Sequence, residues 1–216
     1  DSFLQKFSDG TTAYFTLDPR LQRQAEEILE KLRVPWGALV ALNPKTGRVL
    51  ALADHSVVAG DNTEVALRAT FPAASLFKLI TSSAAVEESG LSGTESVAYR
   101  GGDYTLTRAN FMPNDKRDRK SMTLAEALGK SCNPVFARVA LEDLAPSSLE
   151  RYARSFGFNA TIPFELPLQM SYFAVDEDDY NIARTAAGFG EAKLSPLHAA
   201  LVTAAFANEG MMMRPR

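Results

Sequence analysis

The chain has 216 residues, of which 46% are apolar, and 23 basic against 26 acidic side chains give a net charge of −3. That length fits one large domain or two small ones, and the apolar fraction argues against global disorder. The mild negative charge gives no sign of a nucleic-acid-binding surface. With one cysteine, Cys132, and two separated histidines, the sequence predicts no intramolecular disulfide and no metal site.

No apolar run is long enough to span a bilayer, and no signal peptide is visible. The sequence begins at Asp1 rather than at a methionine, which is typical of an excised or processed piece. A membrane anchor outside this chain therefore stays open.

In chain order, the first expected element is a strand at 11–17, which is rich in β-branched and aromatic residues. Asp18 and Pro19 then predict the cap and first residue of a helix that ends before Pro35. Its apolar residues follow helical spacing and should face a core: Leu21, Ala25, Ile28, Leu29 and Leu32.

Two apolar runs at 36–42 and 48–53 flank the turn 43–47 and predict a β-hairpin. Within it, Lys45-Thr46-Gly47 matches a triplet found in serine-peptidase active sites. Because Pro44 and Gly47 stand between two apolar runs, we assign the triplet to turn chemistry instead.

Residues 54–70 are expected to form a loop centred on 60–62, followed by a helix that starts near Ser75 and stops at Gly90. Residues 91–121 are expected to be irregular, because they are polar and rich in Gly, Asn and Asp. A capping box at Thr123 and Glu126 predicts a further short helix.

Helices are expected at 135–144 and 148–156, the second closed by Gly157. Residues 158–180 read as irregular, and the acidic run 176–179 as a solvated face rather than a calcium loop. Ser195 and Pro196 predict the start of a last helix, and the methionines at 211–213 are expected to pack against the core or its edge.

The strongest candidate for chemistry is the pair Ser75 and Lys78. On a helix, residues three apart are surface neighbours, so the hydroxyl and the amine should lie close together. Burial among apolar side chains and the positive end of a helix dipole both lower the pKa of a lysine, which would let Lys78 accept the proton of Ser75. In isolation the bland alternative, a capping serine with a snorkelling lysine, would be favoured.

Ser131 and Asn133 form the second candidate pair. Pro134 disfavours a helical conformation at Asn133, and in an extended or turning segment both side chains can project to one side. Two interpretations stay open from the residues alone. Asn133 either caps the helix that follows, or it holds a substrate amide while Ser131 relays a proton.

With these residues in view, the chain resembles the transpeptidase domain of the high-molecular-weight penicillin-binding proteins over nearly its whole length. The anchors of this resemblance are Thr16-Leu-Asp-Pro-Arg-Leu-Gln22, the stretch from Gly37 to Ala51, Ser75-Leu-Phe-Lys78, the stretch from Leu124 to Asn133, Gly188-Phe-Gly190, the stretch from Leu194 to Ala200, and Ala207-Asn-Glu-Gly210.

The resemblance implies roles. Ser75 would be the acylated nucleophile, Lys78 its proton acceptor, Ser131 the shuttle to the leaving amine and Asn133 the group that orients the donor peptide. It also implies a peptidoglycan DD-transpeptidase acting on D-Ala-D-Ala stem peptides, trapped by β-lactams, with no cofactor or metal. The expected location is extracytoplasmic, in the periplasm or on the outer face of the cytoplasmic membrane. A membrane anchor or glycosyltransferase domain would lie outside this chain.

The sequence departs from the family pattern in two places. Ala74 stands where members often have glycine, and no K-T-G or K-S-G triplet follows Asn133. In the family, the strand that carries this triplet supplies a backbone N–H of the oxyanion hole. Loss of one such N–H costs roughly 100- to 1000-fold in rate in a well-studied serine peptidase. Three explanations stay open: a chain truncated at its C-terminus, a fragment completed by a second chain, or a degenerate relative.

We therefore expect 1–216 to be a single transpeptidase-like domain of the α/β (α+β) class. A mainly antiparallel sheet would be flanked by helices, with C-terminal strands missing and the Ser75 helix central. The 11–17 strand and the hairpin would contribute three strands. The alternative function is a non-catalytic scaffold or sensor domain. A serine β-lactamase is a weaker idea, because no convincing deacylating acidic motif follows Asn133.

Overall fold

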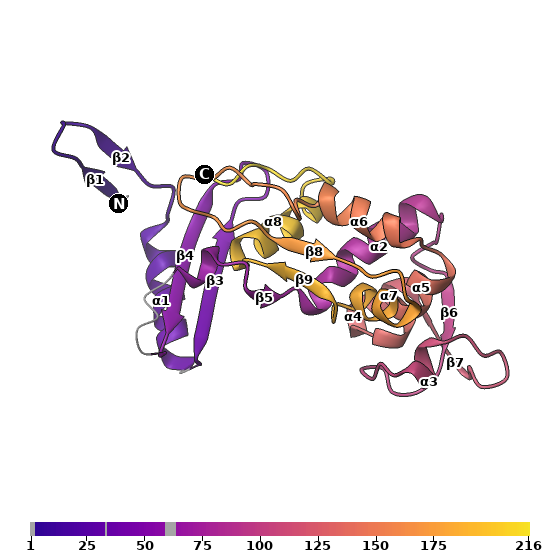
Figure 1. Ribbon diagram of the computed structural model, residues 1–216. Coiled ribbons are helices and arrows are strands. Elements are labelled where there is room, and N and C mark those ends of the chain that lie inside the picture. The colour runs from indigo at the N-terminus through magenta and orange to yellow at the C-terminus, as the bar shows by residue number, and fades with distance from the viewer. Residues whose placement is uncertain (1–2, 33, 59–63) are drawn as a thin grey trace. The chain divides into compact units, whose positions relative to one another are not determined.

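The computed structural model describes residues 3–32, 34–58 and 64–216 (Figure 1). The chain forms two compact units, each built from separate stretches of sequence. The first comprises Asp1–Phe71, Thr161–Met170 and Leu194–Arg216, and the second Pro72–Ala160 and Ser171–Lys193.

The first unit contains two antiparallel hairpins and two long helices. Strands β1 (Leu4–Lys6) and β2 (Thr12–Tyr14) pair with each other, and β3 (Trp36–Leu42) pairs with β4 (Val49–Ser56). The helices are α1 (Pro19–Leu32) and α8 (Pro196–Phe206), and a short 3-10 turn, η1 (Val65–Leu67), follows β4. The predicted hairpin is confirmed. The strand expected at 11–17 is shorter, and among the described residues it pairs with β1 alone.

For helix α1, the predicted N-terminal cap is confirmed, but the predicted set of buried residues is partly wrong. Asp18 accepts hydrogen bonds from the backbone N–H groups of Arg20 and Leu21, as the cap prediction requires. The buried residues, however, are Gln22, Ala25 and Leu29, which pack toward β4, whereas the predicted core residues Leu21, Ile28 and Leu32 are exposed. Gln22 is buried because its side-chain amide bonds the backbone N–H and C=O of Leu52.

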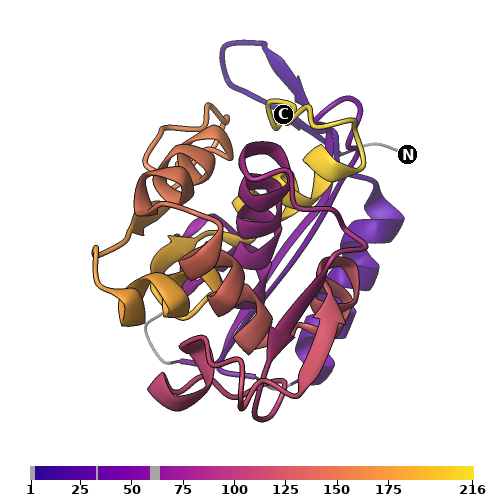
Figure 2. The same cartoon turned by 90° about the vertical axis from the view of Figure 1, so that its right-hand side faces the viewer.

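The second unit is mostly helical. After the 3-10 turn η2 (Ala74–Leu76) it contains α2 (Phe77–Glu88), α3 (Arg108–Phe111), α4 (Leu124–Lys130), α5 (Asn133–Glu142), α6 (Pro146–Ser155) and α7 (Asp179–Ala186). Helix α2 contacts α4, α5, α6 and α7, so the predicted central position of the Ser75 helix holds within this unit (Figure 2).

Short strands lie in the second unit or at its limits along the chain, since Phe71 and Leu194 belong to the first unit. Strands β6 (Ser96–Tyr99) and β7 (Lys120–Thr123) pair antiparallel, as do β8 (Tyr172–Ala174) and β9 (Glu191–Leu194), and a sheet has the order β5-β9-β8 with β5 at Phe71–Pro72. The expectation of irregular chain holds for most of 91–121 and 158–180, but it missed β6, α3 and the start of β7 in the first stretch, and β8 and the start of α7 in the second. These elements are three to eight residues long, which is too short for a clear periodic signal.

Apolar packing surrounds α2. Phe77 stacks on Phe173 with ring centroids 4.9 Å apart and meets Phe158 edge-on at 6.0 Å. A larger cluster centred on α5 includes Val135, Phe136 and Val139, each fully buried. The start of α2 and the start of α5 therefore both emerge from dense packing, which fixes the side chains that they carry.

The other sequence expectations divide as follows. The loop expected at 54–70 is interrupted by the end of β4 and by η1, and its centre at 60–62 lies outside the described residues. The capping box of α4, the last helix capped by Ser195 and the end of α6 before Gly157 are confirmed. The acidic run at 176–179 includes a cap, since Asp178 accepts from the N–H groups of Tyr180 and Asn181. In the described part of the chain, no helix combines the length and the apolar character that a membrane span needs.

Candidate active site

Ser75 and Lys78 lie at the start of the central helix of the second unit. Ser75 is exposed in η2, and Lys78 is fully buried in the first turn of α2. Lys78 Nζ lies 2.9 Å from Ser75 Oγ, as the spacing of three residues predicts. The hydroxyl is thus open to a substrate while the amine beneath it is shielded from water.

Ser131 and Asn133 come to the same place from the turn between α4 and α5. Lys78 Nζ donates to Ser131 Oγ at 3.0 Å and to Asn133 Oδ1 at 2.7 Å, and Ser131 Oγ donates to Ser75 Oγ at 2.7 Å. The structure therefore brings all four candidate residues into one hydrogen-bonded cluster within the second unit. Their chemical roles remain predictions.

The turn achieves this by a backbone reversal that differs from the expectation. Ser131 ends α4 in the left-handed conformation, with φ 56° and ψ 42°, and Cys132 is extended. Asn133 is already the first residue of α5, although Pro134 was expected to keep it out of a helix. Its side chain does not cap the helix, because its amide bonds Lys78 and the backbone carbonyl of Tyr104, at 2.7 Å.

The environment of Lys78 shifts its amine toward the neutral form. Burial lowers the pKa of Lys78 from 10.5 to about 8, and the neighbouring Cys132 thiol opposes part of that shift. The amine also lies 5.7 Å from the centroid of the Phe136 ring, a contact that stabilises the cation. A pKa near 8 leaves an appreciable fraction of Lys78 unprotonated at neutral pH, as a general base requires.

The backbone before Ser75 is strained. Ala74 has a φ of +47°, a region that residues with a Cβ rarely adopt. Gly188 approaches the same point so closely that a Cβ there would lie 1.9 Å from the Ala74 carbonyl oxygen. The departure from glycine at position 74, noted in the sequence, therefore falls where the backbone favours glycine.

Sequence reasoning missed the groups that hold Asn133. The backbone N–H of Asn133 donates to the Asp103 carbonyl at 2.7 Å, and the Tyr104 carbonyl accepts from its side chain. Both carbonyls lie in the stretch expected to be irregular. Backbone acceptors carry no residue-type signal, so nothing in the sequence pointed to them.

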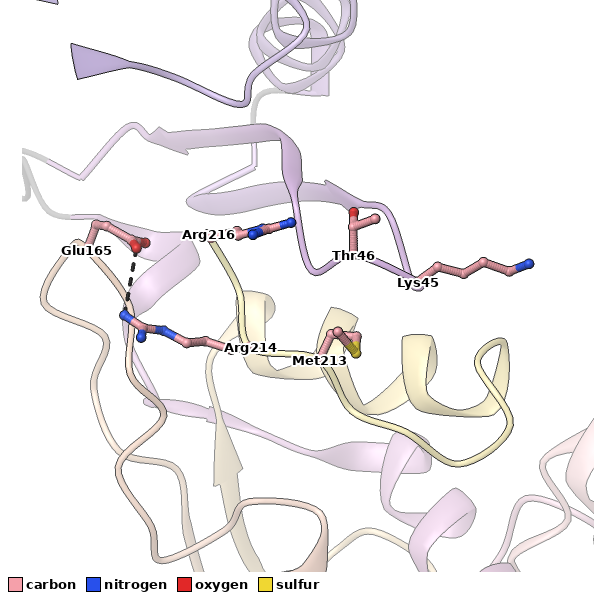
Figure 3. A pocket seen from close by; sticks show the side chains of 6 residues that line it. All are labelled: Lys45, Thr46, Glu165, Met213, Arg214 and Arg216. Carbon is pink, nitrogen blue, oxygen red and sulfur yellow. Dashed lines mark ion pairs between the residues drawn. The ribbon is translucent and has the colours of Figure 1, made fainter. Parts of the chain in front are cut away.

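The rejected triplet Lys45-Thr46-Gly47 lies in the β3–β4 turn, as predicted. Asn43 accepts from the backbone N–H groups of Lys45 and Thr46, and Gly47 has a φ of +72°. Lys45 and Thr46 also line an open pocket of about 410 Å³ in the first unit, together with Glu165, Met213, Arg214 and Arg216 (Figure 3). Arg214 and Glu165 form an ion pair of 3.8 Å there, between exposed side chains. Met213 lies partly buried at this pocket and Met211 is exposed, so packing at the edge describes 211–213 better than the core.

No group of three or more His, Cys, Asp or Glu side chains in the described ranges is arranged to hold a metal ion. The cluster of Ser75, Lys78, Ser131 and Asn133 offers a serine nucleophile, an amine base, a second hydroxyl and an amide. The amine is within hydrogen-bond distance of the other three groups.

Comparison with known proteins defines the class. Residues 37–216 match the family described as the penicillin binding protein transpeptidase domain, so the chain belongs to this family. The mixed α/β fold agrees with solved members. The crystal structure of penicillin-binding protein A from Mycobacterium tuberculosis superimposes with a TM-score of 0.78 at 29% identity, covering 93% of this chain and 52% of that one.

Similar proteins carry related names. The chain is 29% identical over 248 residues to the peptidoglycan D,D-transpeptidase PbpA of M. tuberculosis (strain CDC 1551 / Oshkosh), covering 100% of this chain and 50% of that protein. It is 27% identical over 242 residues to penicillin-binding protein 3 of Bacillus subtilis (strain 168), covering 98% and 35%. The chain thus spans half or less of the length of these curated relatives.

One solved relative has reacted with a β-lactam. The structure of M. tuberculosis penicillin-binding protein A as a penicillin G acyl-enzyme complex matches with a TM-score of 0.73 and 28% identity, covering 93% of this chain and 53% of that one. Acyl-enzyme formation is therefore a property of that relative.

Proposed function

We propose that the protein carrying this chain is a peptidoglycan DD-transpeptidase that cross-links D-Ala-D-Ala stem peptides through an acyl-enzyme on Ser75. The observation that supports this most is the cluster of Ser75, Lys78, Ser131 and Asn133, which is joined by four hydrogen bonds of 2.7–3.0 Å. The family match from 37 to 216 draws on both units, which supports a single transpeptidase domain.

In the first half-reaction, the neutral amine of Lys78 takes the proton of Ser75 across the 2.9 Å contact while Ser75 Oγ attacks the carbonyl carbon between the two D-alanines. The C–N bond then breaks, and the leaving D-alanine amine takes a proton from Ser131. Ser131 is replenished by Lys78 Nζ, which lies 3.0 Å away. The product is an ester on Ser75, and Lys78 is neutral again.

In the second half-reaction, an amine from another peptide strand attacks the ester carbonyl. Its proton returns through the same hydroxyl and amine to Ser75 Oγ as the C–O bond breaks. Asn133 keeps one side-chain N–H beyond the one bonded to Tyr104, and that N–H can hold the donor peptide carbonyl. A β-lactam would form the same ester but present no leaving amine that diffuses away.

We further propose that the protein works on the cell-wall side of the membrane, in the periplasm or on the outer face of the cytoplasmic membrane. Its substrate and the penicillin-binding names of its relatives support this location. An anchor or a glycosyltransferase domain would belong to sequence outside 1–216.

A fluorescent penicillin applied to the protein at its natural length tests the proposal. Wild-type protein should be labelled, and Ser75→Ala should lose all labelling. Ser83→Ala, on the same helix with its hydroxyl bonded to the Leu79 carbonyl, is the matched control and should be labelled like the wild type. Labelling that survives Ser75→Ala would remove Ser75 from its role. A wild type that folds but never reacts would favour the non-catalytic scaffold.

A further inference from the structure

Asn133 donates hydrogen bonds to two consecutive backbone carbonyls. Its backbone N–H donates to the Asp103 carbonyl and its side-chain Nδ2 donates to the Tyr104 carbonyl, both at 2.7 Å. A carbonyl accepts only, so the Tyr104 contact fixes which end of the amide is Nδ2. The other end, Oδ1, must then face Lys78 Nζ, which it meets at 2.7 Å. The position of residues 103 and 104 therefore sets the acceptor offered to the amine.

The side chain of Asp103 ties this turn to both strands of the neighbouring hairpin. Its carboxylate accepts from the Tyr99 hydroxyl at 2.9 Å and from Lys120 Nζ at 3.3 Å. Tyr99 on β6 and Lys120 on β7 are direct partners in the strand register, and Lys120 Nζ also donates to the Gly101 carbonyl at 2.8 Å. One carboxylate thus joins two strands to the turn that holds Asn133.

A buried ion network connects the same turn to the helix that carries Asn133. Arg100, which precedes the turn, donates to Asp118 at 2.7 Å, and Arg138 on α5 donates to both oxygens of the same carboxylate at 2.9 and 3.1 Å. The turn and α5 are therefore already held together without Asp103. Removing the Asp103 carboxylate should loosen the turn locally and leave the fold of the unit in place.

We propose that Asp103 is a positioning residue for acyl transfer. Its carboxylate, held by Tyr99 and Lys120, fixes the carbonyls that orient the Asn133 amide toward Lys78, and so sets the geometry of the amine that activates Ser75. This inference rests on the proposed function of the cluster.

The proposed link is mechanical. Burial lowers the pKa of Lys78, and the adjacent Cys132 opposes part of that shift. The Asp103 charge raises the pKa of Cys132, so Asp103→Asn, which removes the charge and keeps an oxygen, separates an electrostatic contribution from the mechanical one. The other groups around the amine are Ser75 and Ser131, the Asn133 amide and the Phe136 ring. Hydrogen bonds from Tyr99 and then Lys120 lower the pKa of Asp103, so the carboxylate stays ionised and accepting throughout the neutral range.

The test compares Asp103→Ala, Asp103→Asn and Tyr99→Phe in the protein at its natural length. The second-order rate constant of acylation by a fluorescent penicillin is measured from pH 6 to 10, and thermal melting reports the fold. Asp115→Ala removes an exposed carboxylate from the same unit and is the control. Wild type and Ser75→Ala are measured first, so that a failure of the proposed function is seen separately as a wild type that does not react at Ser75.

We expect D103A to acylate about 10- to 100-fold more slowly, the cost of a misplaced catalytic group. Its rate should also reach half-maximum at a lower pH, because an amine that loses the Asn133 oxygen loses a partner for its charged form. D103N keeps an oxygen for Tyr99 and Lys120 and should recover most of the rate, and Y99F, nearly isosteric in the core, should fall between.

Three results would overturn the proposal. D103A could acylate at the wild-type rate at every pH, or D103N could acylate as slowly as D103A. The third is a D103A rate that falls only in proportion to its folded fraction, with the pH midpoint of acylation unchanged. If D103A does not fold, Y99F and D103N carry the same test. A wild-type rate and midpoint in Y99F, or a D103N that acylates more slowly than Y99F, would then count against it.

Discussion

Lys78 combines full burial with three polar neighbours, and that combination decides what it can do. A charged amine at this place would be held by Ser75, Ser131 and Asn133, yet burial still brings its pKa down to about 8. Desolvation therefore outweighs the hydrogen bonds that favour the charged form. The result is an amine that can be a base near neutral pH without leaving its partners.

The first prediction concerns the pH dependence of acylation. Because only the neutral amine can take the proton of Ser75, the rate constant for penicillin acylation should rise with pH and reach half its plateau near pH 8, the pKa of Lys78. Stopped-flow labelling from pH 6 to 10 measures this profile. A rate that is flat across that range would rule Lys78 out as the titrating base.

The second prediction is that Lys78 costs stability. The folded-state pKa lies below the ordinary 10.5, so the charged form is penalised in the folded protein, fully below about pH 8 and no longer above 10.5. Lys78→Met should lose acylation, and at pH 7 its unfolding free energy should compare favourably with that of the wild type. That advantage should decrease by on the order of 3 kcal/mol between pH 7 and pH 10.5. Urea unfolding of both proteins at pH 7.5 and 9.5 compares them, and a difference that stays constant or grows with pH would contradict the assignment.

The third prediction concerns the strained residue before the nucleophile. Ala74 at φ +47° sits in the left-handed region, whereas Ala73 has an ordinary helical φ of −61°. Ala74→Gly should be neutral or stabilising by up to about 1 kcal/mol, because relief of the strain offsets the flexibility of glycine. Ala73→Gly should destabilise by about 0.5–1 kcal/mol. Equal losses of melting temperature in the two variants would show that Ala74 is not strained.

At the scale of single elements, α5 is held by charge as well as by apolar packing. Arg138 is 1% exposed and is paired with Asp118, whose pKa falls to about 2 because its hydrogen bonds outweigh the effect of its burial. The pair fastens α5 to the chain that leads into β7.

The fourth prediction follows from that pair. Arg138→Met should cost about 3–5 kcal/mol of unfolding free energy, because it leaves a buried carboxylate with fewer partners, at the lower end since Arg100 remains. Arg138→Met combined with Asp118→Asn should lose less than the single change. Arg151→Met, which removes the exposed pair with Glu88, should cost no more than about 1 kcal/mol and is the control. Urea unfolding compares the wild type with these three variants. An Arg138→Met variant as mild as the control would contradict the network.

Elements with a terminal signal could be predicted, and those without one could not. Helix starts were predicted at Asp18, Thr123 and Ser195 because each has a side-chain oxygen that can cap a helix. In the structure, each of these oxygens accepts a hydrogen bond from a backbone N–H in the first turn. Strands β6 and β7 lack any such signal, since Ser96–Tyr99 and Lys120–Thr123 are four-residue segments stabilised by pairing with one another. Contacts between distant segments, not local preference, create them.

At the scale of the whole molecule, the sequence predicted the cluster better than its support. Ser75 and Lys78 are one helical turn apart, so local geometry suffices to bring them together. The prediction that Ser131 and Asn133 lie close to Ser75 and Lys78 depended on the family resemblance. The left-handed conformation of Ser131 could not be derived from its residue type. The carbonyls of Asp103 and Tyr104 were beyond prediction, since any residue supplies a carbonyl.

The chain spans about half of its M. tuberculosis relatives and belongs to their family, so its central claim is best tested on the protein at its natural length. The fifth prediction concerns the adduct formed with penicillin G. The mass of the protein is measured after incubation with penicillin G, and peptide mapping then locates the modified residue. The account predicts one added penicilloyl group, on the peptide that contains Ser75 and absent in Ser75→Ala. An adduct on any other residue, or none on a folded protein, would contradict it.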